Sequence, residues 1–196
     1  MSHYFTDNKD LDSNRQEFNY KFDNEEFVFT TDCGVFSKDA VDYGSYLLIK
    51  CVYQKPLGSK ILDLGCGYGV IGIILSRYNP FTEVHLVDVN SRATELAKLN
   101  GKKNNVKIDV FQTDDIRSLN NNYSTITLNP PIRAGKVVMF SLYERAYDCL
   151  EKGGKLYIVI QKKHGANSSY EKLKDLFDEV TILDKIHGHW LIEAVK

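Results

Sequence analysis

The sequence predicts an α/β fold in which helices cover both faces of a mostly parallel sheet. From Lys60 onward, short β-rich and mostly apolar segments recur at 60–65, 83–89, 106–113, 124–130 and 155–161. Stretches that suit helices or connections follow the first four, which is the alternation of βαβ units. Residues 179–196 differ, because two strand-like runs are joined there by a short turn at His187-Gly188. Strands joined so closely are antiparallel, so we expect the last strand to oppose the others.

An N-terminal appendage precedes this sheet. Residues 17–30 alternate apolar and polar side chains on both sides of an Asp23-Asn24 pair, which predicts a β-hairpin with a tight turn. We therefore expect two parts, a polar segment with its hairpin at 1–38 and one α/β domain at 39–196.

Capping residues and periodicity place three helices. Ser37 suits the N-cap of a helix with apolar residues at roughly helical spacing, namely Val41, Leu48, Ile49 and Val52. Residues 92–104 and 137–154 have amphipathic patterns. Gly101 and Gly153 are expected to mark the ends of these two helices.

Composition excludes several classes of protein. The chain has 196 residues, 43% of them hydrophobic. It has no apolar run near the roughly 20 residues that a membrane span needs. Its polar, acidic start does not resemble a secretory signal. The four cysteines are far apart and form no CxxC pair, so we expect free thiols in a cytoplasmic protein, without disulfides or a metal site.

The net charge of −1 hides an asymmetry. Residues 1–45 carry ten acidic and four basic side chains, a net of −6, whereas residues 46–196 carry sixteen and twenty-one, a net of +5. A mildly basic domain is compatible with a nucleic-acid substrate. Solvated surface charge explains the same numbers, so charge alone leaves the partner open.

The segment KILDLGCGYGVIG combines a strand, a glycine-rich loop and the start of a helix. Gly65, Gly67 and Gly69 let the backbone turn sharply and approach a ligand closely. GYGVIG also fits the GxGxxG fingerprint, and Asp88 ends the next strand, where a ribose-binding acid belongs. We expect a nucleoside cofactor; a tight structural turn is the alternative.

Acidic residues favour S-adenosylmethionine over NAD as that cofactor. Asp63 lies inside the strand, two residues before the first glycine, and suits a cofactor whose amino-acid tail is positively charged. The same carboxylate would be unhelpful beside a pyrophosphate. Asp114 and Asp115 end the third strand, where the amino group of adenine needs an acceptor. A buried salt bridge or a helix N-cap explains Asp114 equally well.

Four motifs follow one another in order: DLGCGYG, VDVN, QTDD and NPPI. With these motifs the chain resembles, over about residues 30–196, the class I S-adenosylmethionine-dependent methyltransferases. The resemblance implies a Rossmann-like, seven-stranded sheet with an antiparallel last strand, and S-adenosyl-L-methionine as the cofactor.

The resemblance also implies which residues bind the cofactor. The loop glycines would line its methionine part, and Asp63 would order that loop and face the amino group. Asp88 would accept hydrogen bonds from the ribose, and Asp114 would hold the adenine. The full set implied by position is Asp63, Gly65, Cys66, Gly67, Gly69, Asp88, Val89, Asp114, Asp115, Ile116 and Asn129.

In this family an Asn-Pro-Pro stub marks methyl transfer to a planar NH2 group on a base or a glutamine amide. Such a nitrogen is a poor nucleophile because its lone pair is delocalised. The resemblance implies that the Asn129 side-chain oxygen and the Pro130 carbonyl accept its two N–H bonds and draw it toward tetrahedral geometry. Proline stiffens the stub and lacks a competing N–H, so positioning supplies most of the catalysis. The implied catalytic set is Asn129, Pro130, Pro131 and Ile132.

The fourth residue of the stub narrows the family. Many adenine- and glutamine-methylating members have an aromatic residue there, whereas this chain has Ile132. The strings NPPIRAGK, GVFS, DYGS and VIQKKHGA resemble small, single-domain relatives of the guanine-N2 methyltransferases of small-subunit (16S) ribosomal RNA. Gly188-His189 replaces the GY of that subgroup, a departure from its pattern.

Substrate contacts are expected where the strands end, because the carboxyl ends of parallel strands face one ligand crevice. Arg133 and Lys136 follow the stub and Lys162 follows the fifth strand, so each is a candidate for an RNA phosphate. Solvated cationic loops are the alternative. Phe36 is a candidate to cover the cofactor or stack on a flipped base, with a core position as the alternative.

The leading function is methylation of the exocyclic N2 amine of a guanine, with ribosomal RNA or the small ribosomal subunit as partner. The alternatives are methylation of a glutamine amide or of adenine N6, a non-catalytic RNA-binding module, and an NAD-dependent oxidoreductase. The target nucleotide, the role of residues 1–45 and the oligomeric state stay open.

Overall fold

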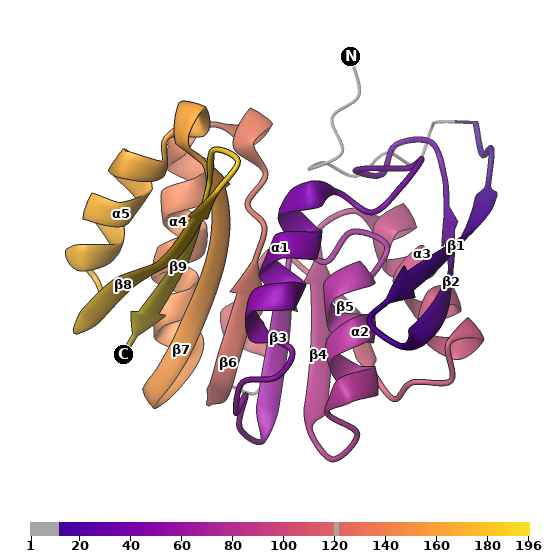
Figure 1. Cartoon of the computed structure of the whole chain (residues 1–196), viewed down its shortest axis with the longest axis horizontal. Helices are drawn as coiled ribbons and strands as arrows, with labels where there is room; N and C mark the ends of the chain where they lie inside the picture. The colour runs from indigo at the N-terminus through magenta and orange to yellow at the C-terminus, as the bar shows by residue number, and fades with distance from the viewer. Residues whose placement is uncertain (1–11, 120–121) are drawn as a thin grey trace.

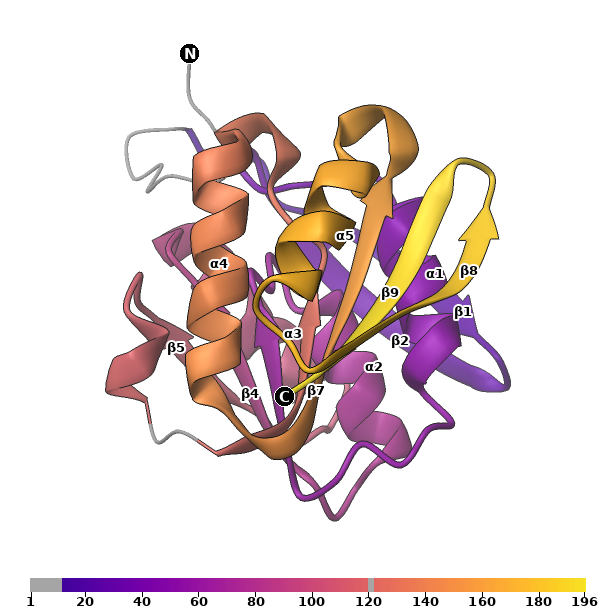
Figure 2. The same ribbon diagram turned by 90° about the vertical axis from the view of Figure 1, so that its left-hand side faces the viewer.

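A computed structural model describes residues 12–119 and 122–196, so residues 1–11 of the predicted polar segment lie outside the described part. At its centre is a seven-stranded sheet with the order β5-β4-β3-β6-β7-β9-β8, covered by helices on both faces (Figures 1 and 2). The strands are β3 (Lys60–Leu64), β4 (Glu83–Asp88), β5 (Asp109–Gln112), β6 (Tyr123–Leu128), β7 (Leu150–Gln161), β8 (Glu179–Ile186) and β9 (His189–Val195). The predicted α/β, Rossmann-like fold is confirmed.

The last strand, β9, is the antiparallel one. Strands β3 to β7 pair in parallel, whereas β9 lies between β7 and β8 and runs against both. His187 and Gly188 form the turn before β9, with φ of 46° and 78°. Two consecutive residues with positive φ match the twist of a tight hairpin, so the predicted antiparallel end is confirmed.

Each face of the sheet has its own apolar core. Helices α1 (Tyr43–Val52), α2 (Val70–Tyr78) and α3 (Ser91–Lys103) cover one face, and α4 (Lys136–Cys149) and α5 (Ala166–Lys174) cover the other (Figure 2). Ile49 and Ile73 are fully buried on the first face, as Tyr143 and Leu173 are on the second. Burying such a side chain contributes about 1.5–3 kcal/mol, so the two clusters fix the helices on the sheet.

The first helix begins later than the sequence predicts. Its N-cap is Asp42, whose carboxylate accepts a hydrogen bond from the Ser45 backbone N–H at 2.9 Å. Ser37 is not the N-cap. It has a φ of 54°, in the left-handed region, and its hydroxyl donates to the carbonyl of Ala40 at 2.6 Å. Ser37 therefore lies in a turn before the helix, and Val41 lies outside the helix.

Neither predicted helix-ending glycine ends its helix. Gly101 lies within α3, where an added Cβ would come to 2.5 Å from the Ile108 side chain, so a larger residue would force that side chain to shift. Helix α4 already ends at Cys149, because Leu150 takes an extended conformation and starts β7. Gly153, at φ 78°, lies in the irregular first part of that strand.

The predicted hairpin is present and packs against α3. It consists of β1 (Gln16–Phe22) and β2 (Glu25–Thr31), with Asp23 at φ 52° in the turn (Figure 1). The Asn100 amide accepts from the Thr30 N–H at 2.7 Å and donates to its carbonyl at 2.9 Å, and Asn104 bonds Val28 in the same way. Two side-chain amides thus satisfy the β2 edge as a neighbouring strand would. The domain boundary at residue 38 stays a prediction.

Short 3-10 segments lie where three connections leave the sheet, namely η1 (Ile116–Ser118), η2 (Ile132–Ala134) and η3 (Lys162–His164). In the described part of the chain, no helix has the length and apolar character that crossing a bilayer requires.

Candidate active site

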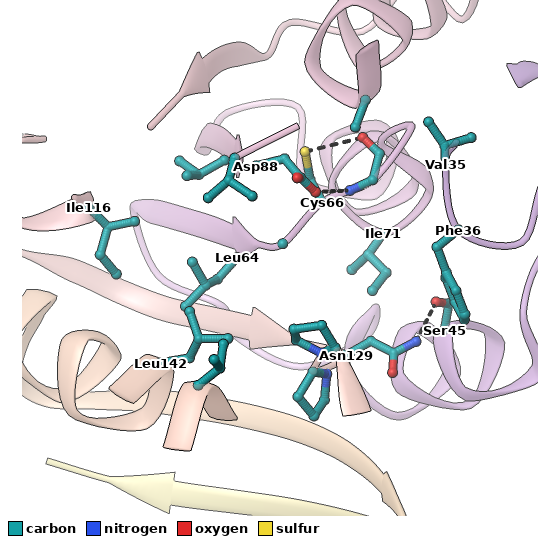
Figure 3. A pocket seen from close by; sticks show the side chains of 18 of the residues that line it. Val35, Phe36, Ser45, Leu64, Cys66, Ile71, Asp88, Ile116, Asn129 and Leu142 are labelled. Atoms are coloured by element: carbon teal, nitrogen blue, oxygen red, sulfur yellow. Dashed lines mark hydrogen bonds between the residues drawn. The ribbon is translucent and has the colours of Figure 1, made fainter. Parts of the chain in front are cut away.

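A cavity of about 400 Å³ lies at the carboxyl edge of the parallel strands (Figure 3). The ends of β3, β4 and β6, the loop before α1 and the first turns of α4 form its wall. Apolar side chains in that wall include Phe36, Leu64, Ile71, Ile116 and Leu142. A mostly apolar hollow of this size with a few polar groups suits a nucleoside-sized ligand.

The glycine loop leaves its backbone open toward this cavity. Gly65 and Gly67 line the cavity and have φ of 72° and 55°, a conformation that favours glycine. An added Cβ at either position would meet nothing within 4 Å, so space for a ligand lies against the main chain. Gly69 differs, because its Cβ would contact Ala97 and Leu86 at 3.2 Å. Gly69 therefore permits packing of α2 and does not line the cavity.

The Asp88 carboxylate stands beside the loop at the end of β4. One oxygen accepts from the Gly67 N–H and the other from the Asn90 N–H, both at 2.9 Å. Burial raises the pKa of this carboxyl, and these backbone donors lower it. Asp88 and Val89 both line the cavity. Each carboxylate oxygen has a further lone pair, so Asp88 can accept from ribose hydroxyls.

Asp63 lies under the loop and is not part of the cavity wall. It is buried, and its oxygens accept from the Gly72 N–H at 2.9 Å and from the Thr127 hydroxyl at 3.2 Å. Burial raises the pKa of Asp63 to about 7, although these hydrogen bonds oppose the rise. The geometry thus shows Asp63 holding the first turn of α2, which orders the glycine loop. It gives no support to the predicted contact with an amino group.

The structure places only some of the predicted adenine-binding residues in the cavity wall. Asp114 and Ile116 line the cavity, as does the Cys66 side chain on the loop. Asp115 does not. It caps η1 by accepting from the Arg117 N–H at 3.2 Å. A direct contact of Asp115 with a cofactor is therefore not part of this geometry.

Asn129 is held by Asp42, the N-cap of α1, and by Ser45 in the first turn of that helix. Its amide nitrogen donates to the Asp42 carboxylate at 2.8 Å and to the Ser45 hydroxyl at 3.0 Å, and Figure 3 shows the second of these bonds. A carboxylate only accepts hydrogen bonds, so it fixes which end of the amide faces it. Among the described residues none donates to the amide oxygen of Asn129, and Asp42, Ser45 and Asn129 all line the cavity.

The prolines of the stub also line the cavity, but Ile132 does not. Among the described residues none donates to the Pro130 carbonyl, whereas the Pro131 carbonyl accepts from the Ala134 N–H at 2.9 Å. Pro130 therefore has a free acceptor next to Asn129. Ile132 packs against the second core cluster.

The predicted cations lie outside the cavity, on the segments that leave the same edge. Arg133 is exposed in η2, Lys136 is exposed at the start of α4, and Lys162 is exposed in η3. Their roles as phosphate contacts stay predictions. Phe36 lines the cavity mouth and is 41% exposed, so the structure does not place it in the core.

Sequence reasoning missed several residues of the wall. Asp42 and Ser45 belong to the DYGS string but received no role, because only the fold shows that they contact Asn129. Val137 and Val138 line the mouth although they are 84% and 42% exposed. Their exposure beside a cavity marks them as candidate contacts in the structure, but no sequence pattern indicates it.

The wall fits S-adenosylmethionine. The open backbone at Gly65 and Gly67 has room for the amino-acid part, and the Asp88 carboxylate suits a ribose. The apolar wall near Ile116 suits adenine. In residues 12–119 and 122–196, no cluster of three or more His, Cys, Asp or Glu residues could hold a metal ion.

The chain is similar to one family of known proteins over most of its length. Residues 26–193 match the family described as methyltransferase small domain. YbxB of Bacillus subtilis, described as uncharacterized, is 41% identical over 197 residues and covers 99% of this chain and 98% of its own. Ribosomal RNA small subunit methyltransferase C of Aliivibrio fischeri is 33% identical over 148 residues, with 74% and 43% covered.

A solved structure has the same fold. It is the Thermus thermophilus 16S rRNA N2 G1207 methyltransferase in complex with AdoMet and guanosine, with a TM-score of 0.83 and 24% identity. The match covers 93% of this chain and 50% of that one. The chain therefore spans about half the length, or less, of the small-subunit ribosomal RNA methyltransferases that it matches.

Proposed function

The chain belongs to the methyltransferase small domain family and is an S-adenosylmethionine-dependent methyltransferase, and from that premise we propose that it methylates the exocyclic N2 amine of a guanine in small-subunit ribosomal RNA. The observation that carries the proposal is the fixed amide of Asn129, whose oxygen and the free Pro130 carbonyl form a pair of acceptors at the cavity. A planar amine has two N–H donors, one for each.

The residues of the stub supply the positioning. When bound, S-adenosylmethionine provides an electrophilic methyl group on a sulfonium. Asn129 and Pro130 accept from the two N–H bonds of the amine, which draws its lone pair out of conjugation. The rigid proline stub holds that lone pair in line with the methyl group. As the amine nitrogen bonds to the methyl carbon, the carbon–sulfur bond would break and leave its electron pair on sulfur as a neutral thioether. The nitrogen would then give up one proton to solvent, so no strong base is needed.

Guanine in ribosomal RNA is favoured over other amines by the relatives. The curated relatives with a named substrate are ribosomal RNA small subunit methyltransferases C, and the solved 16S rRNA methyltransferase structure holds guanosine. Exposed Arg133, Lys136 and Lys162 lie at the same edge as the cavity and suit a polyanion. The proposed partner is therefore the RNA or the small subunit, and the proposed location is the cytoplasm.

The identity of the methylated product shows which substrate the protein uses. Purified protein is incubated with methyl-labelled S-adenosylmethionine and either ribosomal RNA or small subunits from cells that lack the gene. Label in N2-methylguanosine after nuclease digestion is expected. Label in N6-methyladenosine, or in a glutamine of a ribosomal protein, would replace the proposed substrate while leaving the chemistry of the stub intact.

A further inference from the structure

A second, more open pocket lies beside the cavity, and we call it the flank pocket. The end of β7, η3 and the start of α5 form one side, and the β8–β9 turn forms the other, at the same edge of the sheet (Figures 1 and 2). The Lys162 N–H donates to the Gly188 carbonyl at 2.8 Å, which ties the two sides together. The polar side chains of the pocket are Gln161, Lys162, Lys163, Asn167, His187 and His189.

The flank pocket is cationic. Lys162 and Lys163 are adjacent and exposed, and no carboxylate lines the pocket. Within the described residues, neither ammonium group lies within ion-pair distance of an acid, unlike Lys155 and Lys172 on the same part of the fold. Two uncompensated like charges repel each other, and a phosphate placed between them would remove that repulsion.

An aromatic platform adjoins these lysines. The Tyr43 ring stacks on Tyr46 and on His187, each at 5.9 Å between centroids, and meets His189 edge-on at 5.5 Å. His187 is exposed and ends the stack beside the lysines. A hydrogen bond of 2.9 Å between the Tyr43 hydroxyl and His187 Nδ1 fixes the stack, while 41% of Tyr43 stays exposed. In the described chain, the Nδ1 atom of His189 is the one buried side-chain nitrogen or oxygen without a hydrogen-bond partner.

The platform connects the flank pocket to the cavity. Tyr43 directly follows Asp42, which lines the cavity and holds Asn129. In the sheet, β7 lies next to β6 and β9 lies next to β7. Neighbouring strands are about 4.8 Å apart and each residue rises about 3.3 Å, so His189, two strands across from Asn129 and two residues further along, lies about 12 Å from it. A nucleotide adjacent to one held at Asn129 reaches that far.

We propose that the flank pocket binds a single-stranded RNA nucleotide next to the methylated one, with its phosphate on Lys162 and Lys163 and its base on the Tyr43–His187 stack. The inference rests on the proposed function and adds a second RNA contact to it. Cations beside an exposed aromatic face are the combination that binds single-stranded nucleic acid.

Binding of a short, fluorescently labelled, mixed-sequence oligoribonucleotide at several salt concentrations tests the inference. Lys162→Ala/Lys163→Ala should bind more weakly, with a salt slope smaller by about 0.7 for each lost phosphate contact. Lys107→Ala/Lys152→Ala, a control pair of exposed lysines at the opposite edge, should behave as the wild type.

The aromatic platform is tested in the same titrations. Tyr43→Ala should lower the affinity by about 5- to 150-fold, the range for loss of one stacked base. Tyr43→Phe should retain most of the affinity, and Phe81→Ala, which removes a fully exposed ring elsewhere, should change nothing. Thermal unfolding and S-adenosylmethionine affinity confirm that each variant is folded.

Two results would overturn the inference. Wild-type affinity in both Lys162→Ala/Lys163→Ala and Tyr43→Ala would mean that RNA does not use the pocket. Weaker binding in the lysine variant alone would mean a general anion site without a base.

The methylation assay distinguishes failure of this inference from failure of the proposed function. If wild-type protein methylates guanine in RNA while the pocket variants bind normally, only the flank pocket is wrong. If the wild type labels protein and no RNA, the proposed function is wrong.

Discussion

The side-chain amide of Asn129 donates to the Asp42 carboxylate at 2.8 Å, across a sequence separation of 87 residues. This contact joins the end of β6 to the start of α1. It decides which atom of the amide faces the ligand, because a carboxylate cannot donate. In the proposed mechanism Asp42 is therefore a positioning residue, which acts on the reaction through Asn129.

Loss of this contact should affect turnover more than binding. Asp42→Ser is the informative variant, because serine also caps helices well while its short side chain leaves Asn129 without the charged acceptor. We expect kcat to fall by up to about 10²-fold, as small misplacements do, with little change in the KM for S-adenosylmethionine. Ser45→Ala should show the same pattern more weakly. Unchanged kcat in both folded variants would remove the positioning role.

Asp88 should determine cofactor affinity. Asp88→Ala removes a charged acceptor, typically about 1.5–3 kcal/mol, and releases the Gly67 N–H. The expected loss of S-adenosylmethionine affinity is therefore about 10- to 150-fold by calorimetry. Glu95→Ala, an exposed acid on α3, is the control. Normal affinity in folded Asp88→Ala would show that the ribose is held elsewhere.

Asp63 should make stability depend on pH. Its folded pKa of about 7 lies above the usual 3.8, so the folded protein retains a proton that the unfolded chain releases. Stability is then lost as pH rises from about 4 to about 7, by at most about 1.4 kcal/mol per pH unit. Asp63→Asn retains an acceptor for the Gly72 N–H and removes the titration. In chemical unfolding without cofactor, the free energy of unfolding of the variant should increase relative to that of the wild type as the pH rises to 7. Parallel profiles would refute the raised pKa.

Arg133 should contribute to RNA binding and not to cofactor binding. Arg133→Ala is expected to raise the KM for RNA and to reduce the salt slope by about 0.7–0.9, the value for one phosphate contact. Its affinity for S-adenosylmethionine should stay at the wild-type value. Lys107→Ala provides the matched loss of one exposed cation at the far edge. If the two variants have equal RNA kinetics, Arg133 is an ordinary solvated side chain.

Features set by adjacent residues could be predicted from the sequence. The His187-Gly188 turn specifies the antiparallel end of the sheet, and the positive φ at Gly65 and Gly67 follows from their place after a strand. The Asn-Pro-Pro stub ends β6 because proline lacks a donor for the sheet. The glycine loop and the stub form part of the cavity wall.

Contacts between distant segments could not be predicted. Gly101 has the type expected at a helix end, but it lies inside α3, where the Ile108 side chain packs closely over it. Ser37 is as good a cap as Asp42 by residue type, and only the turn around Ala40 decides between them. The contacts of Asp63 could not be predicted for a different reason. The direction of a side chain on a buried strand depends on which elements cover each face of the sheet.

The central claim is that Asn129 and Pro130 draw the amine out of conjugation. Asn129→Ala should therefore lower kcat by about 10²–10³, the effect of removing one preorganised transition-state hydrogen bond. Cofactor affinity should change far less, because Asp88 and the glycine loop lie on other strands. Asn129→Asp should not rescue turnover, since its carboxylate would oppose that of Asp42.

The most direct measurement is single-turnover methylation of RNA by wild type, Asn129→Ala, Asn129→Asp and the exchanged pair Asp42→Asn/Asn129→Asp. The exchange restores a donor facing an acceptor and again leaves one oxygen for the cavity. We expect the rate to be highest in the wild type, intermediate in the exchanged pair and lowest in the two single variants. A near-normal rate in folded Asn129→Ala would contradict the account, because the stub would then only end the strand.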